Sequence, residues 1–279
     1  MSAHEFAPAK INLALHVRRR EADGYHAIET LFVFADVGDT VSWAGEADGF
    51  SLEIAGPFAG GLASDGDNLV LRAARALAEV ADVRRGGRLM LDKRLPVASG
   101  IGGGSADAAA TLRLLNRQWG LGWPVERLAI LGAAIGADVP ACVHDVPMRG
   151  EGRGEQLVPI GFAGSAAVLV NPGVAVSTAA AFGAWNRQDR GGLAHGDALA
   201  AARAGRNDLE PSALGLAPAI GDALGRLLAA PGATLARMSG SGATCFALFD
   251  TQAAADDAAR SLAGVRPDWW VAATRLRES

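Results

Sequence analysis

Apolar and polar residues alternate along several short segments of the chain, beginning near the N-terminus. Between Phe6 and Val17, every second position from Ile11 onward is apolar, which is the period of a half-buried strand. Lys10 and Asn12 share the opposite face of that strand. Similar patterns predict strands at residues 29–37, 86–93, 166–170, 234–238, 244–249 and 270–274, and two short strands within 41–54.

Other segments carry the spacing of an amphipathic helix. From Leu69 to Val80 the apolar residues fall on one side, and Asp67-Asn68 supplies a start signal. Ser105 or Asp107 is the expected cap of a second helix. Further helices are predicted at residues 106–118, 124–135, 178–185, 198–204, 218–228 and 253–263. Residues 148–156 are rich in glycine and charge, which predicts a loop and a domain boundary, and the polar residues 188–196 are expected to be mobile.

Composition narrows the class of protein. Half of the 279 residues are hydrophobic, which suffices for a sizeable core in one large domain or two ordinary ones. The net charge of −4 indicates no basic face, which argues against nucleic-acid binding. Cys142 and Cys245 lack a metal-ligand spacing, and no signal region or membrane-spanning apolar run occurs. We therefore expect a cytoplasmic protein with two buried thiols and no membrane partner.

A glycine-rich turn lies between the strand predicted at 86–93 and the helix predicted at 106–118. Gly100, Gly102, Gly103 and Gly104 leave backbone N–H groups unshielded, and a helix N-terminus follows them. These features favour an anion site, most naturally for phosphate. The terminal Gly-Lys-Ser/Thr of a Walker A loop is missing, and Ser105 stands where a dinucleotide fingerprint needs its third glycine. A flexible turn without a ligand stays open as the alternative.

Four isolated residues each allow a structural and a functional interpretation. Lys10, one of two lysines in the chain, is either a solvated surface charge or a functional cation. Tyr25 and His26 follow an Asp-Gly turn, where they either pack on a sheet or meet a planar ligand. Asp138, flanked by Gly136 and apolar residues, is either a cap or a functional carboxylate.

Three separated blocks resemble the motifs of the GHMP kinases, the superfamily of galactokinase and of homoserine, mevalonate and phosphomevalonate kinases. They span residues 8–13, 96–110 and 238–244. More specific blocks span residues 22–26, 67–69, 135–140 and 207–211. They most resemble members that phosphorylate a cytidyl diphosphate sugar alcohol. The resemblance covers nearly the whole chain. The departure is Ala98-Ser99, where a more continuous glycine run is expected.

The resemblance implies a two-domain α+β fold with a deep cleft between the domains. It implies that residues 1–157 bind ATP and that residues 158–279 bind the substrate. The implied reaction transfers the γ-phosphoryl group of ATP, with Mg²⁺, to the 2-hydroxyl of a methylerythritol moiety in the non-mevalonate route to isoprenoid precursors. The expected state is a monomer or a weak homodimer.

The resemblance also implies roles for single residues. Asp138 is the expected base and Lys10 the cation beside it, favouring the ionised carboxylate and stabilising the transferring phosphoryl group. Ser105 is the candidate to reach Mg²⁺ or the β-phosphate. The implied ATP-binding residues are Pro96, Val97, Ala98, Ser99, Gly100, Ile101, Gly102, Gly103, Gly104, Ser105 and Ala106, with Asn68 and Lys93 near the adenosine.

On the substrate side, the resemblance makes Asn12 a substrate contact. Tyr25 is expected to stack on the cytosine ring with Phe182 on the other side, and His26 to hydrogen-bond to it. The third block contains a further glycine loop, here called the third glycine loop, which is expected to support the phosphate loop and close the cleft. It comprises Ser239, Gly240, Ser241 and Gly242.

Two alternatives remain beside this interpretation. Another kinase of the same fold, acting on homoserine or mevalonate, would not need the aromatic residues Tyr25 and Phe182. A nucleotide-binding protein without catalysis would not need both Lys10 and Asp138. A dinucleotide oxidoreductase is disfavoured by the glycine spacing.

Overall fold

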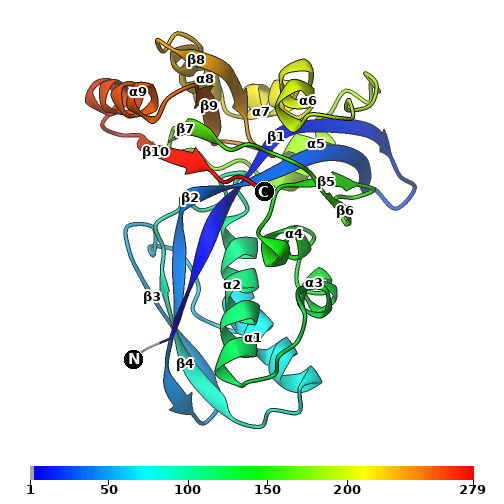
Figure 1. The fold of residues 1–279 in the computed structure, drawn as a ribbon, viewed down its shortest axis with the longest axis vertical. Helices are drawn as coiled ribbons and strands as arrows, with labels where there is room; N and C mark the ends of the chain where they lie inside the picture. Colours follow the sequence, from blue (N-terminus) through cyan, green and yellow to red (C-terminus); the bar gives the residue numbers. More distant parts are fainter. Residues whose placement is uncertain (1–2) are drawn as a thin grey trace. The chain divides into compact units, whose positions relative to one another are not determined.

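The computed structural model describes residues 3–279 (Figure 1). Its contacts divide the chain into two compact units that interleave along the sequence. The first contains the chain up to Ala9, Gly38–Val97 and Gly102–Asp145; the second contains Lys10–Val37, Ala98–Ile101 and Val146–Ser279. Strands β1 (His4–Arg20) and β2 (His26–Ala47) therefore contribute to both units. This division does not follow a single boundary after residue 157, and the assignment of ATP and substrate to the two parts stays a prediction.

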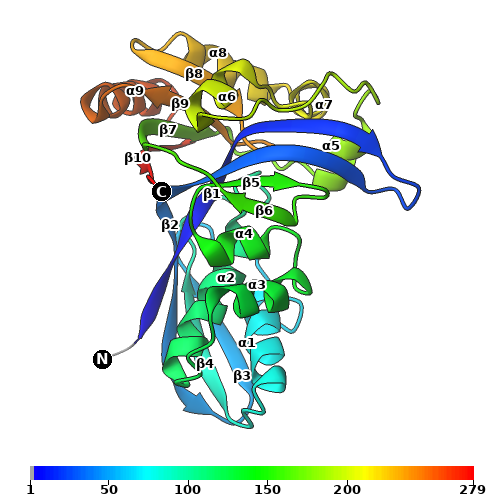
Figure 2. The same ribbon diagram turned by 45° about the vertical axis from the view of Figure 1, so that its right-hand side comes forward.

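The first unit combines a sheet with helices. Strand β4 (Gly86–Asp92) lies between β2, to which it is antiparallel, and β3 (Phe50–Ala55), to which it is parallel. The helices are α1 (Leu69–Val80), α2 (Gly103–Gln118), α3 (Val125–Ala133) and α4 (Val139–His144). Figures 1 and 2 show α1 and α2 side by side. The core includes the fully buried Leu71, Leu77, Leu89 and Leu91.

The second unit contains a sheet in the order β2–β10–β7–β9–β8. Its later strands are β7 (Ser165–Asn171), β8 (Ala233–Met238), β9 (Cys245–Phe249) and β10 (Trp270–Leu276). Strand β5 (Met148–Glu151) pairs with both β2 and β6 (Gln156–Pro159). The helices are α5 (Thr178–Gly183), α6 (Ala198–Ala204), α7 (Glu210–Leu216), α8 (Ala219–Leu228) and α9 (Gln252–Val265). Helices α8 and α9 pack on these strands over a core that includes Val168, Ala247 and Leu262.

Local signals set several boundaries as the sequence predicted. The side chain of Asn68 accepts a hydrogen bond from the Val70 N–H at 2.9 Å, so Asn68 caps α1, whose predicted bounds are confirmed. Asp197 caps α6 in the same way, through a 2.7 Å bond from the Ala200 N–H. The strands predicted at 86–93, 166–170, 234–238, 244–249 and 270–274 are confirmed within a few residues. Both cysteines are free and buried.

Other predictions were wrong. The elements concerned depend on partners that are distant in the sequence, or on a backbone conformation rather than a capping side chain. Neither Ser105 nor Asp107 caps α2; the cap is Gly102, in the left-handed conformation with φ 64°, and the helix begins at Gly103. The loop predicted at 148–156 contains strand β5 and the first residue of β6, with which β5 pairs, and β5 also gains backbone partners from β2. Helix α7, which begins at Glu210, was not among the helices predicted from the sequence.

Candidate active site

The polar face of β1 is buried in the second unit. Lys10 is 3% exposed, and its Nζ donates to Asn12 Oδ1 at 3.2 Å. The ammonium also lies 4.3 Å from the centroid of the Phe32 ring, a cation–π distance. The solvated interpretation of Lys10 is therefore wrong: the fold keeps a cation in low-dielectric surroundings, where its field is stronger than in water.

Asn12 connects β1 to two other segments. Its Nδ2 donates to Thr30 Oγ1 at 2.8 Å, and Thr30 donates in turn to the Ala14 carbonyl at 2.7 Å. Its backbone N–H donates to Ser239 Oγ at 3.0 Å. The orientation of the Asn12 amide beside Lys10 is therefore fixed by buried hydrogen bonds on both sides.

Hydrogen bonds with Ser239, Thr244 and Lys10 hold the part of the glycine loop that lies in the second unit, Ala98–Ile101. Ser239 Oγ donates to the Gly100 carbonyl at 3.0 Å, the Thr244 N–H to the Ser99 carbonyl at 2.9 Å, and the Lys10 N–H to the Ile101 carbonyl at 3.0 Å. Gly100 has φ 75°, and a Cβ there would lie 2.5 Å from the Ser239 carbonyl oxygen, so glycine is required. Ala98 adopts φ 50°, a conformation that would suit the glycine expected there.

The remainder of the loop leads into α2 in the first unit. The left-handed Gly102 is followed directly by Gly103, so α2 begins with two glycines and Ser105. The N–H groups of this turn have no partner within the helix, and the helix dipole adds positive potential. Ser105 is half-buried here. This geometry supports the predicted anion site at a helix of sixteen residues.

Asp138 immediately precedes α4. It has helical backbone angles and makes no side-chain capping hydrogen bond, so the cap interpretation does not describe it. Its residue is half-buried. Its role as a base stays a prediction.

The two residues expected near the adenosine have structural partners in the first unit. Asn68 caps α1 and donates from Nδ2 to the Ala63 carbonyl at 2.9 Å. Lys93 is buried between Asp39 and Asp107, with its Nζ 2.5 Å and 2.7 Å from their carboxylate oxygens. Contact with adenosine stays a prediction for both residues.

Aromatic side chains gather around His26 in the second unit. The His26 ring lies 5.0 Å from Phe182 and edge-on to Trp185 at 5.7 Å. Burial, with the charges of Arg20 and Arg187, lowers the pKa of His26, which therefore stays neutral and keeps both a donor and an acceptor nitrogen near pH 7.

Tyr25 is 60% exposed and lies beneath a different neighbour. The Arg153 guanidinium sits 4.3 Å from its ring centroid and forms ion pairs with Glu21, at 2.7 Å, and Asp23. Arg153 belongs to the turn between β5 and β6, which the sequence did not assign to a site. One face of Tyr25 is thereby occupied by a cation.

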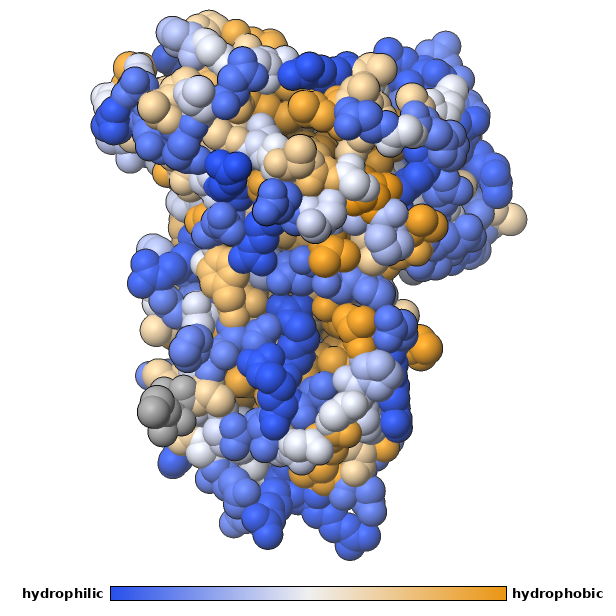
Figure 3. Space-filling model, in the orientation of Figure 1, coloured by the Kyte–Doolittle hydropathy of each residue, from blue (hydrophilic) through white to orange (hydrophobic). Residues whose placement is uncertain are grey.

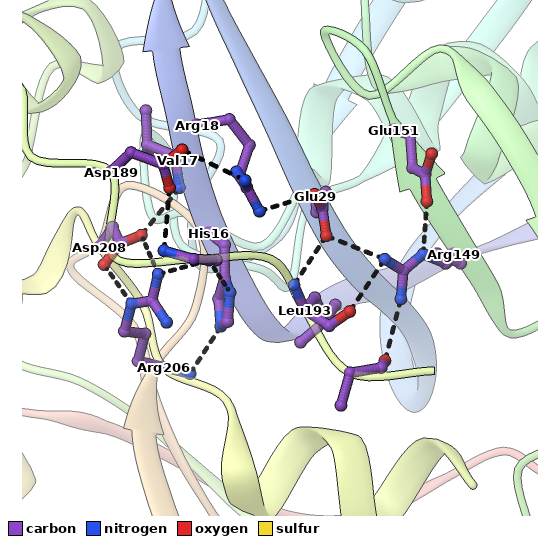
Figure 4. Close-up of polar contacts among 12 residues, drawn as sticks. His16, Val17, Arg18, Glu29, Arg149, Glu151, Asp189, Leu193, Arg206 and Asp208 are labelled. Atoms are coloured by element: carbon purple, nitrogen blue, oxygen red, sulfur yellow. Dashed lines mark hydrogen bonds and ion pairs between the residues drawn. The ribbon is translucent and has the colours of Figure 1, made fainter. Parts of the chain in front are cut away.

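The segment 188–196, predicted to be mobile, is tied to β1, β2 and β5 (Figure 4). Glu29 accepts from the Leu193 N–H at 2.7 Å and pairs with Arg149 at 2.9 Å. Arg149 in turn donates to the carbonyls of Leu193 and Ala194 at 3.1 Å and 3.0 Å. No local sequence signal points to this network, because its members are far apart in the chain.

A residue without an assigned role organises the third glycine loop. The Nδ2 of Asn207 donates to the carbonyls of Met238 and Gly240, both at 2.8 Å. Its Oδ1 accepts from the Leu209 N–H at 2.9 Å. Asn207 belongs to the block 207–211 of the sequence resemblance, and that block was the one available signal. In the same loop, Ser241 Oγ lies 3.0 Å from Thr178 Oγ1.

Two further properties concern metals and membranes. Among the described residues, no group of three or more His, Cys, Asp or Glu side chains is arranged to hold a metal ion. Within residues 3–279, no helix combines the length and the apolar composition needed to cross a membrane. Hydrophilic and hydrophobic residues are interspersed on the face shown in Figure 3.

Comparisons with known proteins agree with this organisation. The GHMP kinases N terminal domain matches residues 68–145, and the GHMP kinases C terminal domain matches residues 189–266. The 4-diphosphocytidyl-2-C-methyl-D-erythritol kinase of Rhizorhabdus wittichii is 57% identical, covering 99% of this chain and 96% of that protein. The kinase of the same name from Methylorubrum extorquens strain PA1 is 50% identical over 97% of each chain.

Solved structures show the same relationship. A crystal structure of 4-(cytidine 5'-diphospho)-2C-methyl-D-erythritol kinase has a TM-score of 0.81 and 33% identity, covering 99% of this chain and 100% of that one. Homoserine kinase from Cytophaga hutchinsonii has a TM-score of 0.73 and 20% identity over 99% and 95% of the two chains, which shows a common fold. The chain therefore belongs to the GHMP kinase family and is a phosphotransferase.

Proposed function

We propose that the protein transfers the γ-phosphoryl group of ATP to the 2-hydroxyl of 4-diphosphocytidyl-2-C-methyl-D-erythritol, a step in non-mevalonate isoprenoid precursor synthesis. The observation that carries this proposal is the 57% identity, over 99% of the chain, with a kinase named for that substrate. The grouping of His26, Phe182 and Trp185 supports it, because homoserine and mevalonate contain no base for such rings to contact.

In this proposal the backbone N–H groups of residues 96–106 bind the phosphates of ATP. The left-handed Gly100 and Gly102, and the free N–H groups at the start of α2, support that role. Mg²⁺ is proposed to enter with ATP, because substrate phosphates supply many of its ligands in kinases, and Ser105 is the candidate protein ligand. When bound, the ion neutralises charge on the phosphates.

Asp138 is proposed to take the proton of the 2-hydroxyl as the oxygen forms its bond to the γ-phosphorus. The bond from that phosphorus to the bridging oxygen breaks, and ADP leaves with the electron pair. Lys10 is proposed to stabilise the negative charge of the transferring group. Its burial and its bond to an oriented Asn12 support a preorganised cation. Asn12 is proposed to contact the substrate.

On the substrate side, Tyr25 and Phe182 are proposed to contact the two faces of the cytosine ring, and neutral His26 to hydrogen-bond with its edge. Ser239–Gly242 is proposed to support the phosphate loop, which agrees with the bond from Ser239 to Gly100.

The test is ADP release by purified protein with ATP and Mg²⁺, using the cytidyl substrate, homoserine and mevalonate in parallel. We expect turnover with the cytidyl substrate alone. Turnover with another alcohol would agree with phosphotransferase activity but contradict the proposed binding site for the cytosine ring.

The role of Asp138 as the catalytic base is tested separately. Asp138→Asn is expected to abolish turnover while ATP binding, followed by calorimetry, changes by no more than about twofold. Asp145→Asn at the other end of α4 is the matched control, since asparagine tolerates the left-handed backbone at that position. Loss of ATP binding in Asp138→Asn would count against its assignment as the base.

A further inference from the structure

Lys93 occupies a buried ion triad that the sequence gave no reason to expect. Its Nζ lies 2.5 Å from Asp39 Oδ2 and 2.7 Å from Asp107 Oδ2, and the exposed fractions of the three side chains are 3%, 0% and 4%. The amine is almost fully buried, and two of its three donors are occupied. A direct contact with a nucleotide base would have to use the third donor, on an ammonium that the protein encloses almost completely.

Asp39 connects the triad to the segment that enters the glycine loop. Its Oδ1 accepts from the Arg94 N–H at 2.5 Å and from the Leu95 N–H at 2.8 Å. Its other oxygen binds Lys93. The backbone just before Pro96 is therefore fixed by a buried carboxylate, whose charge is matched by charge-assisted hydrogen bonds.

Asp107 connects the triad to the helix that leaves the loop. It lies four residues after Gly103, on the same face of α2. The ammonium packs against that first turn directly, because a Cβ at Gly103 would lie only 3.1 Å from Lys93 Nζ. Through Lys93, the entry to the loop at Leu95 and its exit at Gly103 are joined to one buried centre.

The triad holds one ammonium and two carboxyl groups. Asp39 is satisfied by three donors, whereas Asp107 Oδ1 has no hydrogen-bond partner in the described part of the chain. Burial, reinforced by the charge of Asp39 and opposed by Lys93, raises the pKa of Asp107 to about 7. Removing the ammonium would leave the buried Asp39 carboxylate without its counter-ion and Asp107 without the donor on its Oδ2.

We propose that Lys93 is a positioning residue that holds the two ends of the phosphate loop in register, and that its side chain does not read the nucleotide base. The inference rests on the proposed assignment of residues 96–106 to the ATP phosphates. It predicts that changes in the triad affect every nucleoside triphosphate alike, because the phosphates are what the loop holds.

The experiment compares ATP and GTP in the full-length protein. In Lys93→Met, kcat/KM for each nucleotide is expected to fall by about tenfold or more, because a small displacement of positioned groups is costly. The ratio of the two values should stay within about twofold of the original protein, and KM for the cytidyl substrate should change by less than about twofold. A loss confined to ATP, with GTP unaffected, would overturn the proposal.

A second variant gives a result that general destabilisation would not. Asp107→Asn keeps an acceptor for Lys93 and cannot ionise, so its loss of kcat/KM should be smaller than that of Lys93→Met. Assayed at a pH above the pKa of Asp107, the addition of Asp107→Asn to Lys93→Met should restore about threefold or more of the lost kcat/KM, because one of the two unmatched carboxylates is gone. If the double variant is no better than Lys93→Met, or worse, the triad does not act through charge balance and the proposal fails.

Two controls complete the design. Arg94→Met removes the neighbouring exposed cation, which pairs with Asp92 at the surface. This variant should leave kcat/KM for both ATP and GTP unchanged. If Lys93→Met does not fold, Asp107→Ala breaks the connection to α2 while keeping the pair with Asp39. That variant should weaken binding of Mg²⁺-ATP and Mg²⁺-GTP by the same factor in calorimetry, and unchanged binding of both would overturn the inference. The binding measurement requires no turnover, so it stands even if the cytidyl compound is not the substrate.

Discussion

The hydroxyl of Ser239 donates to the carbonyl of Gly100 at 3.0 Å, across 139 positions of sequence. The same oxygen accepts the Asn12 N–H at 3.0 Å. Ser239 is fully buried, so no water replaces either bond if the hydroxyl is removed. One side chain thus fixes the glycine loop against the strand that carries Lys10.

Ser239→Ala should therefore impair both stability and nucleotide use. We expect the free energy of unfolding to fall by about 1–3 kcal/mol, because two buried backbone groups lose their partner. In denaturant titration this should exceed the effect of Ser165→Ala, whose hydroxyl is only partly buried. We also expect kcat/KM for ATP to fall about tenfold. Reduced stability with unaltered kcat/KM would show that the bond does not shape the loop.

Tyr25→Ala should mainly weaken binding of the cytidyl substrate. Stacking of a base on an aromatic ring contributes about 1–3 kcal/mol, so KM for that substrate should rise by about fivefold to a hundredfold while KM for ATP stays unchanged. Arg153→Ala should give a smaller increase in the same direction, because it removes the cation that orients the ring. Equal effects of Tyr25→Ala on both substrates would contradict the stacking role.

Asp107 makes the stability depend on pH. Because its pKa rises from 3.8 to about 7 on folding, the native state retains a proton that the unfolded chain releases. Its contribution to stability should fall as pH rises from about 4 to about 7, by on the order of 1 kcal/mol per pH unit. Asp107→Asn cannot titrate, so its stability should not fall in this way. The unfolding free energy of the variant, relative to that of the original protein, should therefore increase as the pH rises across this range. Parallel curves in denaturant titrations at pH 5, 6 and 7.5 would contradict the assignment.

His16 should make the attachment of the 188–196 segment sensitive to acid. Its Nε2 accepts the Arg206 N–H at 3.2 Å, so the proton resides on Nδ1, 3.1 Å from the Gly191 carbonyl. Burial, with the charge of Arg206, lowers the pKa of His16, while Asp208 and Glu29 oppose the shift.

The unfolded chain therefore binds the proton first, and this contribution to stability should fall as pH drops below about 6.5. Amides in the segment should lose hydrogen-exchange protection at pH 5.5 relative to 7.5, after correction for intrinsic rates. In His16→Phe, which cannot titrate, the difference should disappear. Equal protection of the original protein at both pH values would show that His16 does not control the attachment.

Elements with local instructions could be predicted from the sequence. Asn68 and Asp197 accept hydrogen bonds from N–H groups two and three residues away, so the starts of their helices could be predicted from nearby residues. Gly102 gave no such instruction, because its capping role comes from a left-handed backbone rather than a side chain. Strand β5 was missed since Arg149 and Gly150 become strand residues only by pairing with Leu31 and Thr30.

The candidate site divides along the same line. Motif resemblance identified Lys10, Asn12 and Ser239, whereas their hydrogen bonds to one another required the fold. The burial of Lys93 could not be predicted, because Asp39 and Asp107 are 54 and 14 positions away and carry no pattern linking them to it. The contact between the rings of Phe182 and His26 was likewise hidden, because the two residues are far apart in the sequence.

Strand β10 is the last strand of the chain, yet it lies between β2 and β7 in the sheet of the second unit. During synthesis, β7 and β2 emerge long before the strand that separates them. Neither can complete its hydrogen bonds until Trp270–Leu276 has left the ribosome. The second unit is thus expected to reach its native form only after this strand has emerged, with strand edges exposed to chaperones until then.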